Sequence, residues 1–382
     1  MRIDSLNMYW RLKSQKGPDN VVPDFAPFEF DFRTDIQLIT QKYNEQVRQC
    51  LETIYKAEYN IGYLQDVNQI AKPYGTDFKR FIDQVIANKS QPVETIVEVG
   101  CGGCTLLEEL QNQGFEVLGI DPSPIAVEAG KRKQIIVIED FFPSPLVTKK
   151  ADVIFHSDVL EHVSDPVNVL HAQKKQLNPE GLILISIPDC NESIALGDAS
   201  MIIHQHLNYF DNESLRLCVE AAGLEVVSIE TARYGGSLYC CAKNTENQSF
   251  SPDTCAEKFD RFTETLDLAC LHITNVLKKT LKDKSVKTGF YVPLRALPYL
   301  AMMSHSSDFR FFDDTHHWYN SHFDGLDVTI ENISDLHRKP VDQLFIMSLS
   351  FGEKIKEIVQ EKVPSIKTIV TLKDLLSVNR LS

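Results

Sequence analysis

The sequence has 382 residues, of which 43% are hydrophobic and 24% are charged, as is usual for globular proteins. This length suits two or three domains of about 100 to 200 residues each. The formal net charge of −14 argues against nucleic acid as a partner, because a phosphate backbone is bound by a surface rich in lysine and arginine.

The first residues, MRIDSLNMYWRLK, contain charges where a secretory signal would need an apolar run. No apolar stretch in the chain approaches the ~20 residues that cross a membrane. We therefore expect a cytoplasmic protein without a membrane partner. The nine cysteines are odd in number and scattered, and we expect reduced thiols that are mostly buried.

The N-terminal part, residues 1–88, mixes aromatic residues with turn residues and continues with a helical pattern from Ile36 to Ile86. The helical expectation rests on apolar residues that recur every three to four positions. We expect an irregular start followed by helices that cap the next domain.

From Thr95 the pattern changes to short runs of β-branched residues that alternate with amphipathic stretches, which predicts a parallel sheet with crossover helices. Helix ends are marked by residues that favour those positions, such as Asp165 before a proline at a start and Gly223 after an end. The predicted parallel strands are residues 95–100, 116–121, 134–140, 151–158 and 182–189, followed by two that can pair as an antiparallel edge, 224–232 and 237–243.

Residues 89–247 are therefore predicted to form an α/β domain with a doubly wound, mostly parallel sheet of the Rossmann-like kind. Ser251 and Pro252 favour the start of a long helix, which we expect to link two domains over residues 248–286. Strand-like runs then alternate with helical or loop stretches, so residues 287–382 are predicted to form a second, smaller α/β domain. These runs are residues 288–293, 309–314, 343–350 and 365–372.

The stretch VEVGCGGC, residues 97–104, permits three interpretations. The first is a zinc or redox site, since Cys101 and Cys104 have the C-x-x-C spacing. A four-cysteine zinc site needs a second pair. The adjacent cysteines Cys240 and Cys241 lie in a predicted strand and face opposite ways, so we expect no metal site.

The second interpretation is a loop that binds a dinucleotide. Gly100 and Gly102 occupy the first and third positions of that fingerprint, where small residues let backbone N–H groups approach a phosphate. Thr105 stands at the sixth position, where a third glycine is expected, and its branched side chain would crowd the helix against the pyrophosphate. A nicotinamide enzyme is therefore a weaker alternative that stays open.

The third interpretation comes from a resemblance. Glu98 and the loop GCGG at residues 100–103 resemble motif I of the class I S-adenosylmethionine-dependent methyltransferases, with Cys104 where the last glycine usually stands. Cysteine is itself a small residue, so this departure from the pattern is slight. The resemblance implies that S-adenosylmethionine is the cofactor and that S-adenosylhomocysteine is the product.

The later motifs of that family follow in order. They are matched by Asp121 in GID, Asp140 in IED and the stretch HSDVLEHVSDP at residues 156–166. The resemblance implies that Asp121 binds the ribose hydroxyls and that Asp140 lies near the adenine amine, with Phe141 as a ring partner. The cofactor-binding residues that it implies are Glu98, Gly100, Cys101, Gly102, Gly103, Asp121, Pro122, Asp140, Phe141, Ser157 and Asp158.

Two histidines are placed where an acceptor would be activated. His162 follows the fourth predicted strand, at the edge where the carboxyl ends of parallel strands meet, and His206 lies between the fifth strand and the next helix. A neutral imidazole can accept the proton that carbon or oxygen loses when it is methylated. We therefore predict that His206 or His162 is the catalytic base.

The whole chain resembles the sugar C-methyltransferase family, in which a methyltransferase core with an H-E-H-x-x-Y-F-like stretch precedes a C-terminal α/β domain. HQHLNYF, residues 204–210, carries that stretch, and both histidines named above fall on the family's active-site positions. The family's N-terminal zinc module uses cysteine pairs, and this chain has no cysteine before Cys50, so that module is predicted to be absent. Gln205 replaces the glutamate that partners the histidine, which leaves His206 with less to hold its tautomer.

The predicted function is methyl transfer from S-adenosylmethionine to a small-molecule acceptor. The second resemblance favours a nucleotide-linked sugar or a carbohydrate intermediate, methylated at carbon or at oxygen. The alternatives are an O-methyltransferase of a non-sugar metabolite and a scaffold protein that binds the cofactor without turnover.

Overall fold

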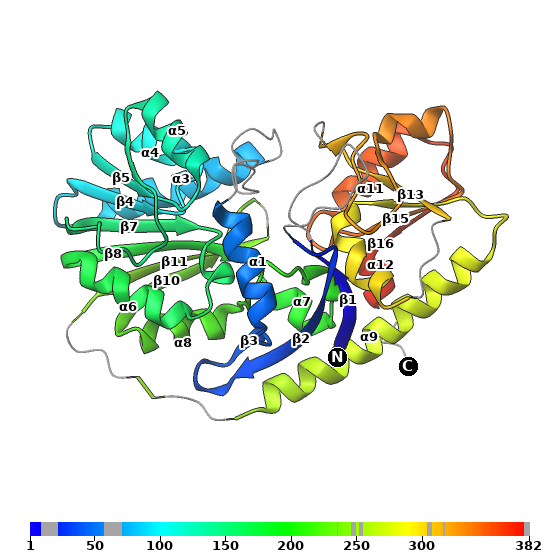
Figure 1. The fold of residues 1–382 in the computed structure, drawn as a ribbon, viewed down its shortest axis with the longest axis horizontal. Coiled ribbons are helices and arrows are strands. Elements are labelled where there is room, and N and C mark those ends of the chain that lie inside the picture. Colours follow the sequence, from blue (N-terminus) through cyan, green and yellow to red (C-terminus); the bar gives the residue numbers. More distant parts are fainter. Residues whose placement is uncertain are drawn as a thin grey trace. The chain divides into compact units, whose positions relative to one another are not determined.

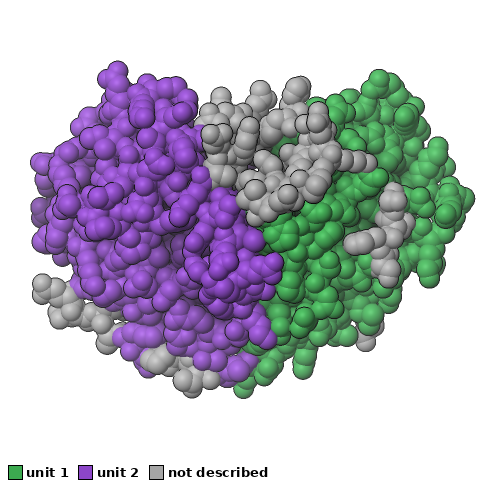
Figure 2. Space-filling model, in the orientation of Figure 1, with its two compact units in different colours: residues 1–30, 192–204, 257–382 green, residues 31–191, 205–256 purple. Residues whose placement is uncertain are grey.

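The structure is a computed structural model that describes residues 1–8, 22–56, 71–234, 236–245, 250–251, 255–303, 308–315 and 318–377. The chain divides into two compact units, which are coloured in Figure 2. Unit 1 comprises residues 1–30, 192–204 and 257–382, and unit 2 comprises residues 31–191 and 205–256.

Unit 2 is built on a sheet whose described strands run in the order β10-β11-β8-β7-β4-β5-β6. The pairs β8–β7, β7–β4, β4–β5 and β5–β6 are parallel. β11 pairs antiparallel with both β8 and β10. The predicted doubly wound, mostly parallel sheet with an antiparallel edge is confirmed. The strands are β4 (Thr95–Val99), β5 (Glu116–Ile120), β6 (Ile136–Ile138), β7 (Ala151–Ser157), β8 (Leu177–Pro188), β10 (Leu224–Thr231) and β11 (Ser237–Asn244).

Helices cover both faces of this sheet (Figure 1). Apolar side chains of α3, α4 and α5 form one core with one face, and those of α6 and α8 form a second core with the other. Cys240 belongs to one core and its neighbour Cys241 to the other, as the predicted alternation of a strand requires. The helices are α3 (Ala71–Asn88), α4 (Thr105–Asn112), α5 (Pro124–Lys133), α6 (Pro166–Gln176) and α8 (Asn212–Ala221).

The helix ends predicted from local sequence are present. The side chain of Asp165 accepts a hydrogen bond from the N–H of Asn168 at the start of α6. Asp211 and Ser214 cap α8 reciprocally, each side chain bonding the backbone N–H of the other residue. Gly223 follows α8 with a φ of +78°, a left-handed conformation that favours glycine. Each side-chain cap contributes about 1 kcal/mol, which is why these boundaries can be read from the sequence.

The N-terminal part differs from the prediction of an irregular start. β1 and β2 are antiparallel strands in which Ile3 lies opposite Phe28. Ala26, Phe28 and Phe30 are buried while their neighbours are more exposed, which is the alternation of a strand. The aromatic residues assigned to irregular chain therefore include one face of β2. The elements of this part are β1 (Arg2–Asn7), β2 (Phe25–Arg33), β3 (Leu38–Gln41), which pairs with β9 (Asn208–Tyr209), and α1 (Glu45–Lys56).

Unit 1 contains a parallel sheet in the order β14-β13-β12-β15-β16, in agreement with a second, smaller α/β domain. The short strand β14 was not predicted. The long helix α9 begins at Glu257 rather than at Ser251, and Pro252 lies outside the described residues. The elements are α9 (Glu257–Lys282), β12 (Thr288–Tyr291), α10 (Leu297–Ala301), β13 (Phe309–Phe312), β14 (Ile330–Glu331), β15 (Gln343–Ile346), α11 (Gly352–Lys362), β16 (Thr368–Thr371) and α12 (Leu372–Ser377).

The compact units cut across the boundaries that we predicted at residues 88, 247 and 286. α9 packs against α10 and α12 and is grouped with them in unit 1. Residues 192–204 also belong to unit 1, because the phenol of Tyr299 donates to Oδ1 of Asp198 and accepts from the N–H of Ala199, both at 3.0 Å. These partners are about one hundred positions apart, a separation that no local pattern reports.

The nine cysteines are free thiols, as predicted, and all but Cys255 are buried. The buried cysteines act as small apolar residues. Among the helices of the described ranges, none combines the length and the apolar content that a membrane crossing needs.

Candidate functional site

The glycine loop leads from β4 into α4 and is held against the end of β5. Gly100 and Gly102 have φ angles of +74° and +45°. The N–H of Gly100 donates to the carbonyl of Ile120 at 2.8 Å, and that of Gly102 donates to Oδ2 of Asp121 at 3.0 Å. A Cβ atom on Gly100 would lie 2.7 Å from Cγ2 of Val159, so a larger residue does not fit there.

The two cysteines of this loop serve as packing residues. Cys101 and Cys104 are buried, with their Sγ atoms 3.8 Å apart. The contact with Cys104, together with burial, raises the pKa of the Cys101 thiol well above its usual range and keeps it protonated. Cys104 has a φ of +56°, so it takes the left-handed conformation that a glycine adopts without strain.

The next two strands bring acidic side chains to the same edge of the sheet. Asp121 and Pro122 follow β5, and Oδ1 of Asp121 accepts a hydrogen bond from the N–H of Ser123 at 2.8 Å. Asp140 follows β6 and accepts from the N–H of Phe141 at 2.8 Å. Because β4, β5 and β6 pair in parallel in this order, their carboxyl ends, and with them the glycine loop, Asp121 and Asp140, lie at one edge of the sheet.

The predicted cofactor residues of these strands differ in how far their side chains are exposed. Glu98 on β4 and Asp121 are 5% and 4% exposed. Burial raises the pKa of Asp121 above its usual value, although two backbone hydrogen bonds oppose the shift. Phe141 is at the surface, and Nζ of Lys56 lies 5.5 Å from the centre of its ring.

On the other side of β4 from β5, β7 ends at Ser157 and is followed by Asp158. Asp158 has a φ of +54°, an uncommon conformation for a residue with a side chain. The phenol of Tyr74 on α3 donates to Oδ1 of Asp158 at 3.0 Å and accepts from Oγ of Ser237 at 2.8 Å. Sequence reasoning did not find Tyr74, because it is one aromatic residue in a helical pattern.

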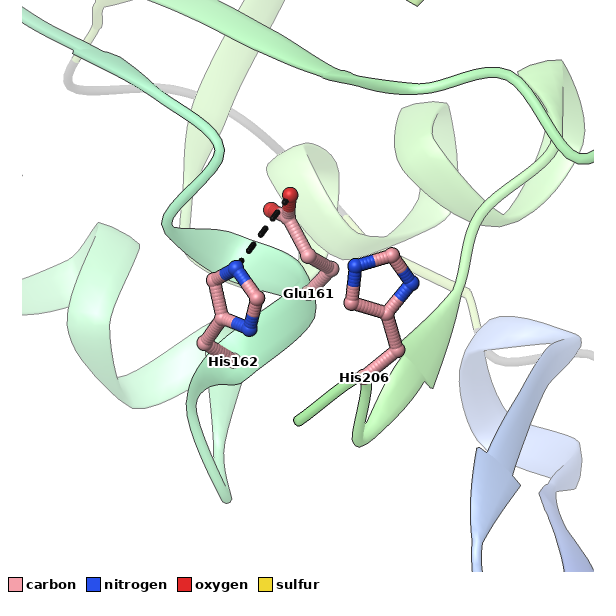
Figure 3. Close-up of side chains that lie close together, drawn as sticks. All are labelled: Glu161, His162 and His206. Atoms are coloured by element: carbon pink, nitrogen blue, oxygen red, sulfur yellow. Dashed lines mark ion pairs between the residues drawn. The ribbon is translucent and has the colours of Figure 1, made fainter. Parts of the chain in front are cut away.

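His162 and His206 come from separate segments but lie together, with ring centres 5.1 Å apart (Figure 3). His162 ends the short 3-10 helix η2 (Leu160–His162), and His206 precedes β9. The side-chain amide of Asn208 holds the two segments together by donating to the carbonyls of Leu160 and Val163 at 2.8 and 2.7 Å. The structure therefore brings together the two histidines predicted to activate an acceptor.

A backbone carbonyl orients His162. Its Nδ1 lies 2.8 Å from the carbonyl oxygen of Gln205, which can only accept a hydrogen bond, so Nδ1 carries the proton. Nε2 is then left with a lone pair in the neutral ring. Burial lowers the pKa of His162, which favours this neutral form.

Glu161 is the third member of the cluster. It is 1% exposed, and neither carboxylate oxygen has a hydrogen-bond partner among the described residues. Its Oε1 lies 3.7 Å from Nε2 of His162, and burial, followed by the charge of Asp158, raises the pKa of Glu161 well above its usual range. One ligand-type atom each from Glu161, His162 and His206 lie within 4.8 Å of one another, so these side chains could hold a metal ion.

Glu161 stands in DVLEH, a stretch that matches a family motif, but the sequence indicated no role for Glu161 itself. The contact with His206 could not be read from it. Tyr55 on α1 also faces this cluster, with its ring centre 5.8 Å from that of His162. Its hydroxyl is buried and has no hydrogen-bond partner among the residues described.

The doubly wound sheet, with a glycine loop after one strand and acids after the next two, defines a Rossmann-like domain of the kind that binds nucleosides. A family profile described as a methyltransferase domain matches residues 69–229. The ubiquinone biosynthesis O-methyltransferase of Dinoroseobacter shibae is 30% identical over 176 residues, which cover 42% of this chain and 68% of that protein. The chain therefore belongs to the S-adenosylmethionine-dependent methyltransferases, the family that motif I and the later motifs resemble.

Other relatives match a shorter part of the chain. The ubiquinone biosynthesis O-methyltransferase of Histophilus somni is 32% identical over 103 residues, which cover 24% of this chain and 43% of that protein. The chain thus spans less than half the length of that relative. A solved S-adenosylmethionine-dependent methyltransferase from Clostridium acetobutylicum has a TM-score of 0.38 and 11% identity, covering 45% of this chain and 92% of that one.

Proposed function

We propose that this protein transfers a methyl group from S-adenosylmethionine to a small-molecule acceptor that is activated beside Glu161, His162 and His206. The observation that carries the proposal is the position of this cluster. It follows β7, the strand next to β4, at the edge of the sheet that carries the glycine loop. An acceptor bound at the cluster is then adjacent to the strand ends where the cofactor is expected.

In the proposed cofactor site, the glycine loop at residues 100–103 lets the nucleoside approach the backbone closely, and the carboxylate of Asp121 holds its ribose. A ribose diol offers two O–H donors, and a carboxylate can accept from both. Asp140 and Phe141 at the end of β6 would contact the adenine. Glu98 supports the loop from the buried strand β4.

The proposed chemistry is a displacement at the methyl carbon. The acceptor atom forms a bond to this carbon while the carbon–sulfur bond breaks, and its electron pair stays on sulfur. The proton that the acceptor loses can pass to an imidazole lone pair, and Nε2 of His162 has the orientation for this role because Nδ1 is held by Gln205. His162 thereby has the fixed tautomer that His206 was expected to lack.

For the acceptor we propose two classes. A nucleotide-linked sugar is supported by the resemblance of HQHLNYF and of the second α/β unit to sugar C-methyltransferases. A non-sugar hydroxyl compound is supported equally by the similarity to ubiquinone biosynthesis O-methyltransferases. A deprotonated oxygen or carbon is needed in both cases, and the same cluster can serve both.

The test is transfer of labelled methyl from S-adenosylmethionine to one panel of nucleotide sugars and one of phenols and other hydroxyl compounds. Cofactor binding is measured separately by calorimetry. We expect His162→Ala to lower kcat by about 100-fold or more, with cofactor affinity unchanged. Cofactor binding without transfer to any acceptor would favour the scaffold alternative, and full kcat in both His162→Ala and His206→Ala would refute the assignment of the cluster.

A further inference from the structure

We infer that Glu161, His162 and His206 form a binding site for a divalent cation. Each offers a ligand atom of a type that transition metals bind, and these atoms lie within 4.8 Å of one another. Figure 3 shows the carboxylate and both rings converging from η2 and from the segment before β9. The sequence alone predicted no metal, because the third ligand comes from a segment more than forty positions away.

The carboxylate of Glu161 is the observation that points to a ligand. It is 1% exposed and both of its oxygens lack a hydrogen-bond partner among the described residues. A buried carboxylate whose charged neighbour, Asp158, is itself an acid is unfavourable unless it is neutralised by a proton or a positive charge. Within the part of the chain that the structure describes, no lysine or arginine lies within 4 Å of it. A cation at the cluster would satisfy this group.

The surroundings of His162 fit the same role. A histidine that binds a metal through one nitrogen almost always donates its other N–H to a carbonyl or a carboxylate, which fixes the tautomer. His162 does this through Nδ1, which lies 2.8 Å from the carbonyl oxygen of Gln205. Nε2, the atom left with a lone pair, is the one that faces Glu161 at 3.7 Å.

Backbone contacts hold the two ligand-bearing segments in place. The N–H of Leu207 donates to the carbonyl of Glu161 at 2.6 Å, so the residue after His206 is tied to the residue before His162. Asn208 adds its two hydrogen bonds to the carbonyls on either side of this turn. Around a metal with metal–ligand bonds of ~2.1 Å, the ligand atoms stand roughly 3 to 3.5 Å apart. Side-chain rotations that move the ligand atoms by about an ångström would therefore close the site.

The donor set indicates which cations would bind. Two imidazole nitrogens and one carboxylate suit Zn²⁺, Mn²⁺, Fe²⁺ or Co²⁺, whereas Mg²⁺ and Ca²⁺ prefer sites made of oxygen. Three protein ligands leave coordination positions open for water or for oxygens of an acceptor. An acceptor hydroxyl bound to such a cation would have a lowered pKa. This consequence for catalysis rests on the proposed function, whereas binding of the cation itself does not. With the cation bound, the imidazoles act as ligands and the cation takes over the activation of the acceptor.

The experiment titrates the full chain, freed of metal by a chelator and dialysis, with Co²⁺ alone, followed by its visible absorption and by metal analysis. We expect one Co²⁺ per chain in the wild type and at least tenfold weaker binding in Glu161→Gln and in His206→Ala. The matched controls are Glu220→Gln and His171→Ala in the same unit. The first removes a carboxylate that is already paired with Arg216, and the second removes an exposed histidine. Both should bind Co²⁺ like the wild type.

Thermal unfolding and cofactor binding of each variant show whether it is folded, and His206→Gln replaces any variant that is not. Absence of stoichiometric Co²⁺ in the wild type, or binding that both site variants leave unchanged, would overturn the inference. Methyl transfer by a protein that binds no cation would overturn it and leave the proposed function intact. Stoichiometric binding without transfer to any acceptor would support the site and count against the proposed function.

Discussion

Substitution of Asp121 by asparagine should weaken cofactor binding by about 10- to 150-fold. Oδ1 and Oδ2 accept from the N–H groups of Ser123 and Gly102 at 2.8 and 3.0 Å, and the same carboxylate is the proposed acceptor for the ribose hydroxyls. Asparagine keeps one acceptor oxygen and places an NH₂ group where the other was. A hydrogen bond to a charged group contributes about 1.5 to 3 kcal/mol, and 1.4 kcal/mol corresponds to tenfold in affinity.

The assay is calorimetric titration with S-adenosylhomocysteine at neutral pH, with thermal unfolding to confirm that the variant is folded. Glu116→Gln is the control, because it removes an exposed carboxylate from the opposite end of the same strand, where it pairs with Lys149. Since burial raises the pKa of Asp121, wild-type affinity should fall on acidification at a higher pH than an ordinary aspartate would give. The reasoning is refuted if folded Asp121→Asn binds within twofold of the wild type and with the same dependence on pH.

Three further predictions concern the scaffold of the site. His156 on β7 is fully buried with both ring nitrogens unpartnered among the described residues, so His156→Leu should raise the free energy of unfolding in urea by about 1 to 3 kcal/mol at pH 7. Burial lowers the pKa of His156 to about 3, so the free energy of unfolding of the wild type should fall by up to about 1.4 kcal/mol per pH unit below pH ~6.5. The same dependence on pH in His156→Leu would contradict this account. A Cβ atom on Gly119 would lie 2.6 Å from Sγ of Cys101, so Gly119→Ala should displace the glycine loop and weaken cofactor binding measured by calorimetry. The double variant Gly119→Ala with Cys101→Ala should recover most of the lost affinity. Asp211→Ala removes the cap of α8 and should lower Tm by about 2 to 4 °C for each ~1 kcal/mol lost, and an unchanged Tm would show that the cap adds nothing.

Much of unit 2 could be predicted because its signals are local. A strand buried on both faces is a short apolar run, a helix start is an aspartate before a proline, and a glycine after a strand marks a tight turn. The positions of the proposed cofactor residues followed from the same signals, since each stands at the end of a predicted parallel strand. The strands of the N-terminal part were missed although Ala26, Phe28 and Phe30 show the period of a strand, because turn residues obscured the alternation.

The sequence by itself determined the class of fold, the edge of the sheet where the cofactor is expected and the two histidines beside it. Tertiary structure decided how those histidines are supported. Gln205 suggested that His206 lacks a partner, yet folding places Glu161 beside both rings and gives His162 a backbone carbonyl. These contacts join segments more than forty positions apart through the hydrogen bonds of Leu207 and Asn208. A local pattern records which side chains are present, but only the packed chain determines which of them share one buried space.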